Sequence, residues 1–332
     1  MATKKRILSG MRPTGKLHLG HFTGALENWV KLQGEYENFH LIADWHVLTT
    51  DYEHPGRIWE NTYEMALDWL AAGIDPEQSP IFRQSQIREH AELHLMFSMI
   101  ISFGRLQRNP TFKEQIRDLG MEDEFSYGHI GYPVLQAADI LIYKANLVPV
   151  GEDQVPHVEL TREIARRFNY LYCQNREPVF PEPEPRLTEF ARLPGLDRKR
   201  MSKSLGNTIL LSDTADEIRV KLRGAITDEQ KVRKNDPGRP EVCPVFAYQK
   251  VFNTNEVPEI EANCRSGALG CVECKRRCGD HIIAFLDPMQ ERRAKYAAKP
   301  DSVIEIIHDG ERQASIVAKE TIAEVRSVMG FE

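Results

Sequence analysis

The spacing of apolar residues in the first half of the chain alternates between two periods. Short apolar runs predict strands at residues 6–10, 38–49 and 146–150. Apolar residues three and four positions apart predict helices at residues 19–32, 58–72, 89–103 and 157–168. Strands that alternate with helices favour a doubly wound parallel α/β sheet.

The pattern changes near residue 178. Residues 178–194 read PVFPEPEPRLTEFARLP, which predicts an extended surface connector with little regular structure. Beyond residue 212 the apolar spacing is almost wholly helical, with helices expected near residues 215–223, 281–298 and 313–328. The sequence therefore divides into an α/β part and a helical part.

Composition limits the class of protein. The chain has 332 residues, enough for about two domains. Hydrophobic residues make up 41% and charged residues 28%, which excludes wholesale disorder. No apolar run is long enough for a transmembrane helix or a secretory leader, so we expect a cytoplasmic protein without a membrane partner. The net charge of −6 gives no sign of nucleic-acid binding, so such a partner would need a local basic patch.

A histidine-containing loop follows the first predicted strand. It reads Arg12-Pro13-Thr14-Gly15-Lys16-Leu17-His18-Leu19-Gly20-His21. His18 and His21 can share one face at the start of a helix, where the helix dipole and free N–H groups favour phosphate. Gly20 would let a nucleotide approach closely. Two neighbouring histidines alone are equally compatible with a structural role.

A second loop lies about 180 residues later and reads Arg200-Met201-Ser202-Lys203-Ser204. Its two cations and two hydroxyls suit the β and γ phosphates of ATP. Alone, such a loop is more often a solvated surface or a phosphorylation site. Together, the two loops resemble the two signatures of class I aminoacyl-tRNA synthetases. Arg200 stands where that family has a lysine, so Lys203 is the better candidate for the catalytic cation.

A polar stripe marks one predicted helix. Tyr132, Gln136, Asp139 and Tyr143 are spaced so that all four share a face that is otherwise apolar. A buried carboxylate needs a donor, so Asp139 is expected either to accept from a ligand or to have a structural partner. An indole N–H and a phenol O–H would serve equally well, so this pattern does not separate tryptophan from tyrosine.

The surrounding sequence resembles the tryptophanyl-tRNA synthetases, through residues 132–141, 148–154 and 157–162. The resemblance implies a Rossmann-like catalytic domain at 1–208 with a helical insertion at about 105–145. It also implies a helical anticodon-binding domain at 209–332. The implied reaction joins L-tryptophan to tRNA(Trp) with Mg²⁺ and ATP, in a homodimer and without a DNA partner. The alternatives are a tyrosyl-type synthetase, a nucleotidyl transferase and a non-catalytic RNA-binding paralogue.

The same resemblance assigns residues to the site. The catalytic residues it implies are His18, His21, Arg200 and Lys203. The ATP-binding residues are Arg12, Pro13, Thr14, Gly20, His21, Lys113, Gly151, Glu152, Asp153, Met201, Ser202, Lys203 and Ser204. The tryptophan-binding residues are Leu8, Gly10, His46, Gln136, Asp139 and Gln154. Leu8 departs from the family, which has an aromatic residue there.

Five cysteines lie within 36 residues of the helical part, at Cys243, Cys264, Cys271, Cys274 and Cys278. In a cytosolic chain this clustering indicates a metal site, and spacing alone favours zinc. The pattern is similar to that of the tryptophanyl-tRNA synthetases that bind a [4Fe-4S] cluster, which implies Cys243, Cys264, Cys271 and Cys274 as ligands, with Cys278 as an alternative to Cys243. Residues 261–299 also hold eight basic and five acidic side chains, a local surplus that suits tRNA phosphates or a solvated helix.

Overall fold

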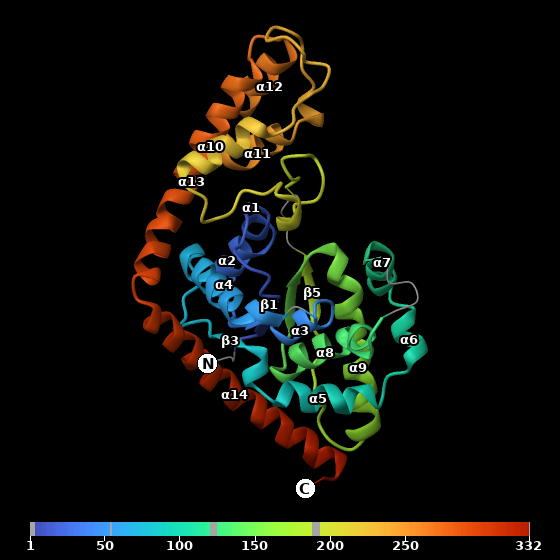
Figure 1. The fold of residues 1–332 in the computed structure, drawn as a ribbon. Helices are drawn as coiled ribbons and strands as arrows, with labels where there is room; N and C mark the ends of the chain where they lie inside the picture. Colours follow the sequence, from blue (N-terminus) through green and yellow to red (C-terminus); the bar gives the residue numbers. More distant parts are fainter. Residues whose placement is uncertain (1–3, 54, 120–124, 188–192, 332) are drawn as a thin grey trace.

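Five parallel strands form the central sheet of the computed structural model, which describes residues 4–53, 55–119, 125–187 and 193–331. Their order is β3-β2-β1-β4-β5 (Figure 1). The strands are β1 Arg6–Met11, β2 Glu37–Ile42, β3 Ile81–Arg83, β4 Leu147–Val150 and β5 Glu184–Leu187. The predicted doubly wound parallel α/β sheet is confirmed.

Two hydrophobic cores cover the two faces of this sheet. Successive side chains of a strand point to opposite faces, so Leu41 of β2 enters one core and Ile42 enters the other. The helices of this part are α1 Leu19–His21, α2 Glu27–Leu32, α3 Trp45–Leu48, α4 Ile58–Ala72, α5 Glu89–Ser98, α6 Phe103–Gln107, α7 Pro110–Leu119, α8 Tyr127–Ile142 and α9 Val155–Tyr172. A five-residue π-helical turn, Phe22–Leu26, joins α1 to α2.

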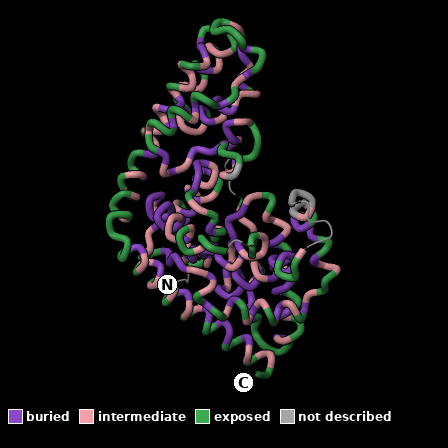
Figure 2. The backbone as a smooth tube through the Cα atoms, in the orientation of Figure 1, coloured by how far each residue is buried: buried purple, intermediate pink, exposed green. Residues whose placement is uncertain are grey.

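The C-terminal part is helical. Its elements are α10 Ala215–Gly224, α11 Pro244–Phe252, α12 Val257–Arg265, α13 Cys271–Ala297 and α14 Pro300–Met329. The last two are long helices that return along the α/β part, where α13 packs on α4 and α14 packs on the edge strand β3 (Figure 1). Both alternate between buried and exposed residues (Figure 2). None of the helices in the described ranges is long and apolar enough to cross a membrane.

Several predicted elements need correction. The strand expected at residues 38–49 ends at Ile42, because the Asp44 carboxylate accepts from the Trp45 N–H and begins α3. The connector at residues 178–194 contains strand β5, and the short strand β3 was not predicted. The helix expected at 89–103 breaks after Ser98, and those expected at 281–298 and 313–328 begin earlier, at Cys271 and Pro300.

Gly310 sets the distance between α14 and the sheet edge. A Cβ built on this residue would lie 2.1 Å from the carbonyl oxygen of Ile81 in β3. Gly310→Ala is therefore expected to push the helix off the strand and to lower the free energy of unfolding by about 1–3 kcal/mol. Urea unfolding checks this. Gly24→Ala, where a Cβ meets nothing within 4 Å, is the matched control. Equal stability of the two variants would contradict the prediction.

Candidate active site

The first loop ends in two stacked imidazoles. It connects β1 to α1, and His18 is the residue before the helix. The His18 N–H donates to His21 Nδ1 at 3.2 Å, and the two rings lie 3.7 Å apart at an interplanar angle of 27°. The structure thus places the two predicted histidines side by side at a helix start.

The second loop is organised by Asn207, which the sequence pattern did not single out as a functional residue. Asn207 Oδ1 accepts from the Ser202 N–H at 2.8 Å, and Nδ2 donates to Asp197 Oδ1 and to the Arg200 carbonyl. The following turn, Lys203–Leu205, ends at Gly206, whose positive φ of 63° favours glycine. This arrangement directs Lys203 toward the first loop.

The two loops meet in one pocket, although about 180 residues separate them in sequence. Lys203 Nζ donates to the Thr14 carbonyl oxygen at 3.0 Å. The pocket is lined by Thr14, His18, His21, Met201, Ser202 and Lys203. A Cβ on Gly20 would lie 2.8 Å from the Met201 sulfur. Gly20 therefore allows the second loop to pack on the first, whereas the sequence suggested only that it admits a nucleotide.

Burial sets the protonation states in this pocket. It lowers the pKa of His18 to about 4 and that of His21 to about 3, with a further contribution from the nearby Lys203 charge. It also lowers the pKa of Lys203 to about 8, partly offset by the carboxylate of Asp68. At neutral pH the pocket therefore offers two neutral imidazoles, each with one N–H donor, beside one ammonium.

The remaining residues predicted to bind ATP surround this pocket less closely. Arg12 Nη2 donates to Thr50 Oγ1 at 2.6 Å, and Pro13 is buried beside it. The loop after β4 holds three more of these residues, Gly151, Glu152 and Asp153. Because β1 and β4 are neighbours, their loops leave the same edge of the sheet, where doubly wound folds bind nucleotides.

Three further predicted residues are Arg200, Lys113 and Ser204, and only Arg200 is shown to lie near the pocket. Arg200 is exposed, yet its charge lowers the pKa of His21, so it lies near the pocket. Lys113 is exposed on α7, and no contact of its side chain ties it to the pocket within the described residues. The side chain of Ser204 lies outside the described part of the structure.

Asp139 lies at the centre of a buried hydrogen-bond cluster. Its Oδ1 contacts His90 Nδ1 at 2.7 Å, and its Oδ2 contacts His46 Nε2 at 3.0 Å. Gln84 Nε2 donates to both oxygens, at 2.7 and 2.9 Å. Burial would raise the pKa of Asp139, but the hydrogen bonds from His46 and His90 outweigh it and hold the pKa well below the usual range. Asp139 is thus an ionised carboxylate with side-chain partners on both oxygens.

Two of these partners were not predicted. Gln84 and His90 belong to no recognisable motif, and only their place after β3 and in α5 brings them to Asp139. His90 is itself oriented, because its Nε2 contacts the Tyr143 hydroxyl at 2.8 Å. The Asp139 carboxylate of the predicted polar stripe is therefore held partly by two residues outside α8, Gln84 and His90.

The other residues predicted to bind tryptophan lie in β1, on α8 and after β4. Leu8 is buried in the core with Phe39 and Leu41. Gly10 faces the backbone of β2, where an added Cβ would lie 2.9 Å from the Leu41 oxygen. Gln136 is partly buried on α8, and Gln154 Nε2 donates to the neighbouring Asp153.

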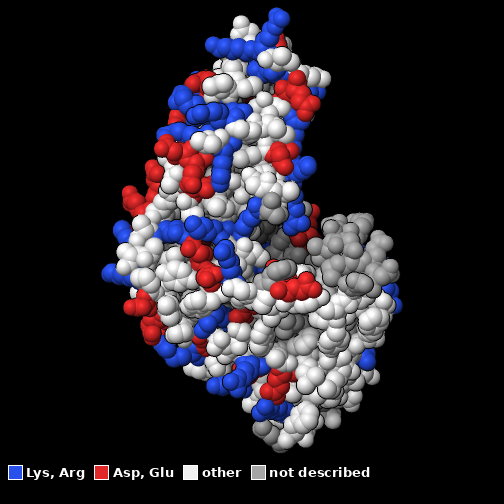
Figure 3. All heavy atoms as spheres, viewed as in Figure 1, with Lys and Arg blue, Asp and Glu red and all other residues white. Residues whose placement is uncertain are grey.

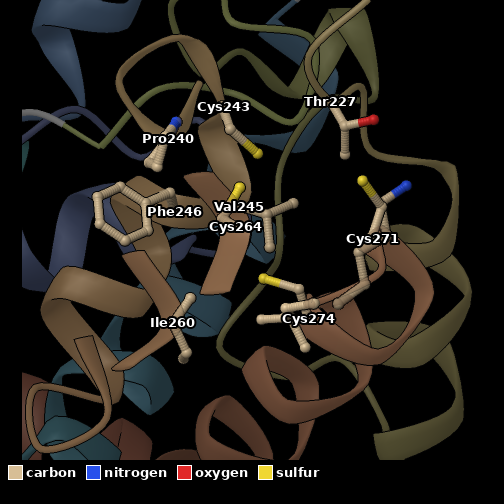
Figure 4. A pocket seen from close by; sticks show the side chains of 11 residues that line it. Thr227, Pro240, Cys243, Val245, Phe246, Ile260, Cys264, Cys271 and Cys274 are labelled. Atoms are coloured by element: carbon tan, nitrogen blue, oxygen red, sulfur yellow. The ribbon is translucent and has the colours of Figure 1, made fainter. Parts of the chain in front are cut away.

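Four cysteines line a second, apolar pocket in the helical part. Cys243 precedes α11, Cys264 lies in α12, and Cys271 and Cys274 begin α13 (Figure 4). Burial raises the pKa of Cys243 and Cys264, and that of Cys274 to about 12. Within the described ranges, no three His, Cys, Asp or Glu side chains are placed to hold a metal ion. Cys278 does not line this pocket; it is buried in the core beside Cys243 and Cys274, with its sulfur facing the Val245 oxygen at 3.9 Å.

Comparison with known proteins shows the family of this chain. Residues 2–287 match the sequence profile of the tRNA synthetases class I (W and Y). The tryptophan–tRNA ligase of Thermotoga maritima is 50% identical, over 98% of this chain and 99% of its own. That of Aquifex aeolicus is 43% identical, over 98% of this chain and 100% of its own.

A solved structure also resembles the chain over nearly its whole length. The tryptophanyl-tRNA synthetase of Campylobacter jejuni, complexed with ADP and tryptophan, superposes with a TM-score of 0.86 at 30% identity. The match covers 98% of this chain and 99% of the other. These relatives favour tryptophan ligation over the tyrosyl-type, nucleotidyl transferase and non-catalytic alternatives. The chain therefore belongs to the class I tRNA synthetases, and among them to the tryptophan–tRNA ligases.

Proposed function

We propose that this chain activates L-tryptophan with ATP in the pocket between its two loops and then transfers the tryptophanyl group to tRNA(Trp). The observation that carries this proposal is the convergence of His18, His21 and Lys203 on one pocket. A protein that only bound RNA would have no use for such a phosphate site.

In the first step, a carboxylate oxygen of tryptophan attacks the α phosphorus of ATP, which enters with Mg²⁺ as its counterion. A new P–O bond forms, and the bond to the pyrophosphate leaving group breaks. The N–H groups of His18 and His21 donate to phosphate oxygens, and the Lys203 ammonium neutralises charge that grows on the leaving group. Catalysis then comes from positioning and electrostatics, without a protein nucleophile.

Recognition of tryptophan is proposed to depend on Asp139 accepting from the indole N–H. The side chains that now contact its two oxygens already use most of the acceptor capacity of a carboxylate. The indole N–H would therefore take the place of one present donor. Gln84 is the best candidate to yield, because its single amide nitrogen spans both oxygens.

Exchange of labelled pyrophosphate into ATP tests the proposed function. The assay is run with tryptophan, with tyrosine and with no amino acid. We expect exchange with tryptophan only. Stimulation by tyrosine would indicate a tyrosyl-type enzyme, exchange without any amino acid would indicate a nucleotidyl transferase, and no exchange at all would indicate the non-catalytic alternative.

The activity is expected to fall on the alkaline side. Lys203 carries its charge only below its pKa of about 8, so kcat/KM for ATP should decline as pH rises through that value. His18 and His21 stay neutral down to about pH 4, so they produce no acid limb between pH 5 and 7. In Lys203→Arg the charge persists, and the alkaline decline should disappear. A decline at the same pH in both proteins would contradict the assignment.

We also propose that residues 209–332 bind tRNA. The surplus of basic over acidic side chains at residues 261–299 supports this proposal, and on the visible face Lys and Arg side chains are interspersed with Asp and Glu (Figure 3). Three of the arginines, Arg265, Arg276 and Arg277, already form ion pairs with acidic neighbours. We therefore assign phosphate contacts to Lys295 and Lys299, which are exposed. Their double substitution by Glu should weaken tRNA binding but not pyrophosphate exchange, and unchanged tRNA affinity would contradict this.

We further propose that Cys243, Cys264, Cys271 and Cys274 hold a [4Fe-4S] cluster, with zinc as the alternative. The fit rests on four cysteine side chains that line one apolar pocket. The other three lie close enough to Cys274 to raise the pKa of its thiol. Cys278 lies in the core outside this pocket, which supports Cys243 as the fourth ligand. When bound, the cluster would cross-link these helices and contribute to their folding.

Purification without air tests the cluster. We expect brown protein with about four iron atoms per chain and visible absorbance that bleaches on reduction. Cys274→Ser should lose the iron. Cys173→Ser is the control: it replaces a buried cysteine at the C-terminal end of α9 and should keep the iron. Colourless protein with one zinc per chain would reject the cluster.

The chain is also proposed to form a homodimer through α5 and α6. Leu95, Met99 and Phe103 are large apolar side chains that are 56, 71 and 57% exposed along this surface. Apolar residues gathered in this way mark interaction sites. Sedimentation should show a dimer that Met99→Glu dissociates, and a monomeric wild-type chain would contradict the proposal.

A further inference from the structure

The long helix α13 begins at the cysteine pocket, and its other end lies near the first loop. It spans 27 residues, about 40 Å at 1.5 Å per residue. Cys271 and Cys274 lie in its first turn, whereas Gln290 and Arg293 lie near its other end, beside α4 (Figure 1). This second end is linked to the backbone that carries His18 through Asp68 of α4 and through Leu211.

Arg293 reaches that backbone through one buried carboxylate. Its Nε donates to Asp68 Oδ1 at 2.8 Å, and Asp68 Oδ2 accepts from the Leu17 N–H at 2.7 Å. Arg293 also donates to Glu64. The Asp68 side chain is fully buried, and that of Arg293 is 16% exposed. Because Leu17 directly precedes His18, the hydrogen bond from the Leu17 N–H to Asp68 holds the backbone in position at the start of the histidine pair.

Gln290 of α13 is linked to the carbonyl group of Leu17. Its Nε2 donates to the carbonyl oxygens of Asp213 and Leu211, at 2.8 and 3.2 Å. The Leu211 N–H in turn donates to the Leu17 carbonyl oxygen at 2.9 Å. Both polar backbone groups of Leu17 are therefore linked to α13, each through a single intervening residue.

We propose that Arg293 and Asp68 are positioning residues for the ATP site, through which α13 holds the histidine pair in register with Lys203. This inference rests on the proposed role of His18 and Lys203 in binding ATP. A buried ion pair adds little net stability compared with apolar residues of the same size, so stability alone does not account for this one. The Asp68 carboxylate also acts on Lys203 directly, by raising the pKa of its ammonium.

Removing only Arg293 would leave the Asp68 charge buried without its main partner. The carboxylate would then take up a proton or turn toward water, and either change weakens its hold on the Leu17 N–H. A displacement of this kind, remote from the reacting atoms, can cost about 100-fold in rate. It would affect ATP and leave the tryptophan pocket around Asp139 intact.

Substitution of Arg293 tests the proposal with two readouts. In Arg293→Met, kcat/KM for ATP in tryptophan-dependent exchange should fall by about 10- to 100-fold, while KM for tryptophan stays within about twofold. Hydrogen exchange of the amides at residues 17–21 should become faster. Arg293→Lys should give smaller changes in the same direction, because an ammonium keeps the charge but loses the forked geometry.

Arg326→Met is the matched control, because Arg326 also ties a C-terminal helix to the catalytic part, through Glu92 of α5. It should alter neither readout. If Arg293→Met matches this control in ATP kinetics and in hydrogen exchange, the ion pair is only structural and the proposal is wrong. If Arg293→Met does not fold, Arg293→Lys decides by the same comparison. Wild-type protein without tryptophan-dependent exchange would reject the proposed function, and hydrogen exchange would still decide whether Arg293 holds the loop.

Discussion

Replacing Lys203 with Met is expected to lower kcat for tryptophan-dependent pyrophosphate exchange by about 100- to 1,000-fold. That is the usual cost of removing one preorganised group that stabilises charge in the transition state. The structure places the Lys203 ammonium in the same pocket as both histidines, 3.0 Å from the Thr14 carbonyl oxygen. Tryptophan affinity should change little, because Lys203 lies in the phosphate pocket. Steady-state kinetics with each substrate varied in turn measures both effects.

Lys199→Met is the control for this prediction. Lys199 carries the same charge four residues earlier, just before the second loop, where it is exposed. Its removal changes the net charge equally but takes nothing from the pocket. Similar losses of kcat in the two variants would show that general charge, and not the placement of Lys203, drives the reaction.

Replacing Asp139 with Asn is expected to lower kcat/KM for tryptophan by about 100-fold. A hydrogen bond to a charged group contributes about 1.5–3 kcal/mol, and the substitution removes the charge that the indole N–H would meet. It also disturbs His46 and His90, which now donate to that carboxylate. KM for ATP should remain near the wild-type value, and exchange with tryptophan varied at saturating ATP checks this.

Asp228→Asn is a closely matched control. Asp228 is another carboxylate whose side chain is 4% exposed, as is that of Asp139, and it is held by Arg239 in the C-terminal part. Losing that charge should reduce stability without changing kcat/KM for tryptophan. If Asp228→Asn lowers this ratio as much as Asp139→Asn does, the loss reflects general destabilisation and the assignment of Asp139 fails.

Local signals in the sequence predicted most of the fold. The helix expected at residues 58–72 matches α4, since its apolar spacing is continuous and Gly73 ends it in a left-handed conformation. Strand β5 was missed because prolines usually mark irregular segments. Pro185 is tolerated there because β5 lies at the edge of the sheet. Strand β3 has only three residues, too few to show an alternating pattern.

The candidate site was predicted only where residues fall in contiguous motifs. His18, His21 and Lys203 belong to such motifs, and Asp139 stands out as a charge on an apolar helix. Gln84, His90 and Asp68 have no such signal, because each matters through a partner at least 49 residues away. Their roles follow from tertiary packing, which a single sequence does not display.

The most direct test is a crystal structure of the chain with ATP and tryptophanamide, an analogue without the attacking carboxylate. We expect the triphosphate between the His18–His21 pair and Lys203, with the indole nitrogen about 3 Å from a carboxylate oxygen of Asp139. A triphosphate bound away from either loop, or an indole ring whose nitrogen faces another group while Asp139 keeps its present partners, would contradict it.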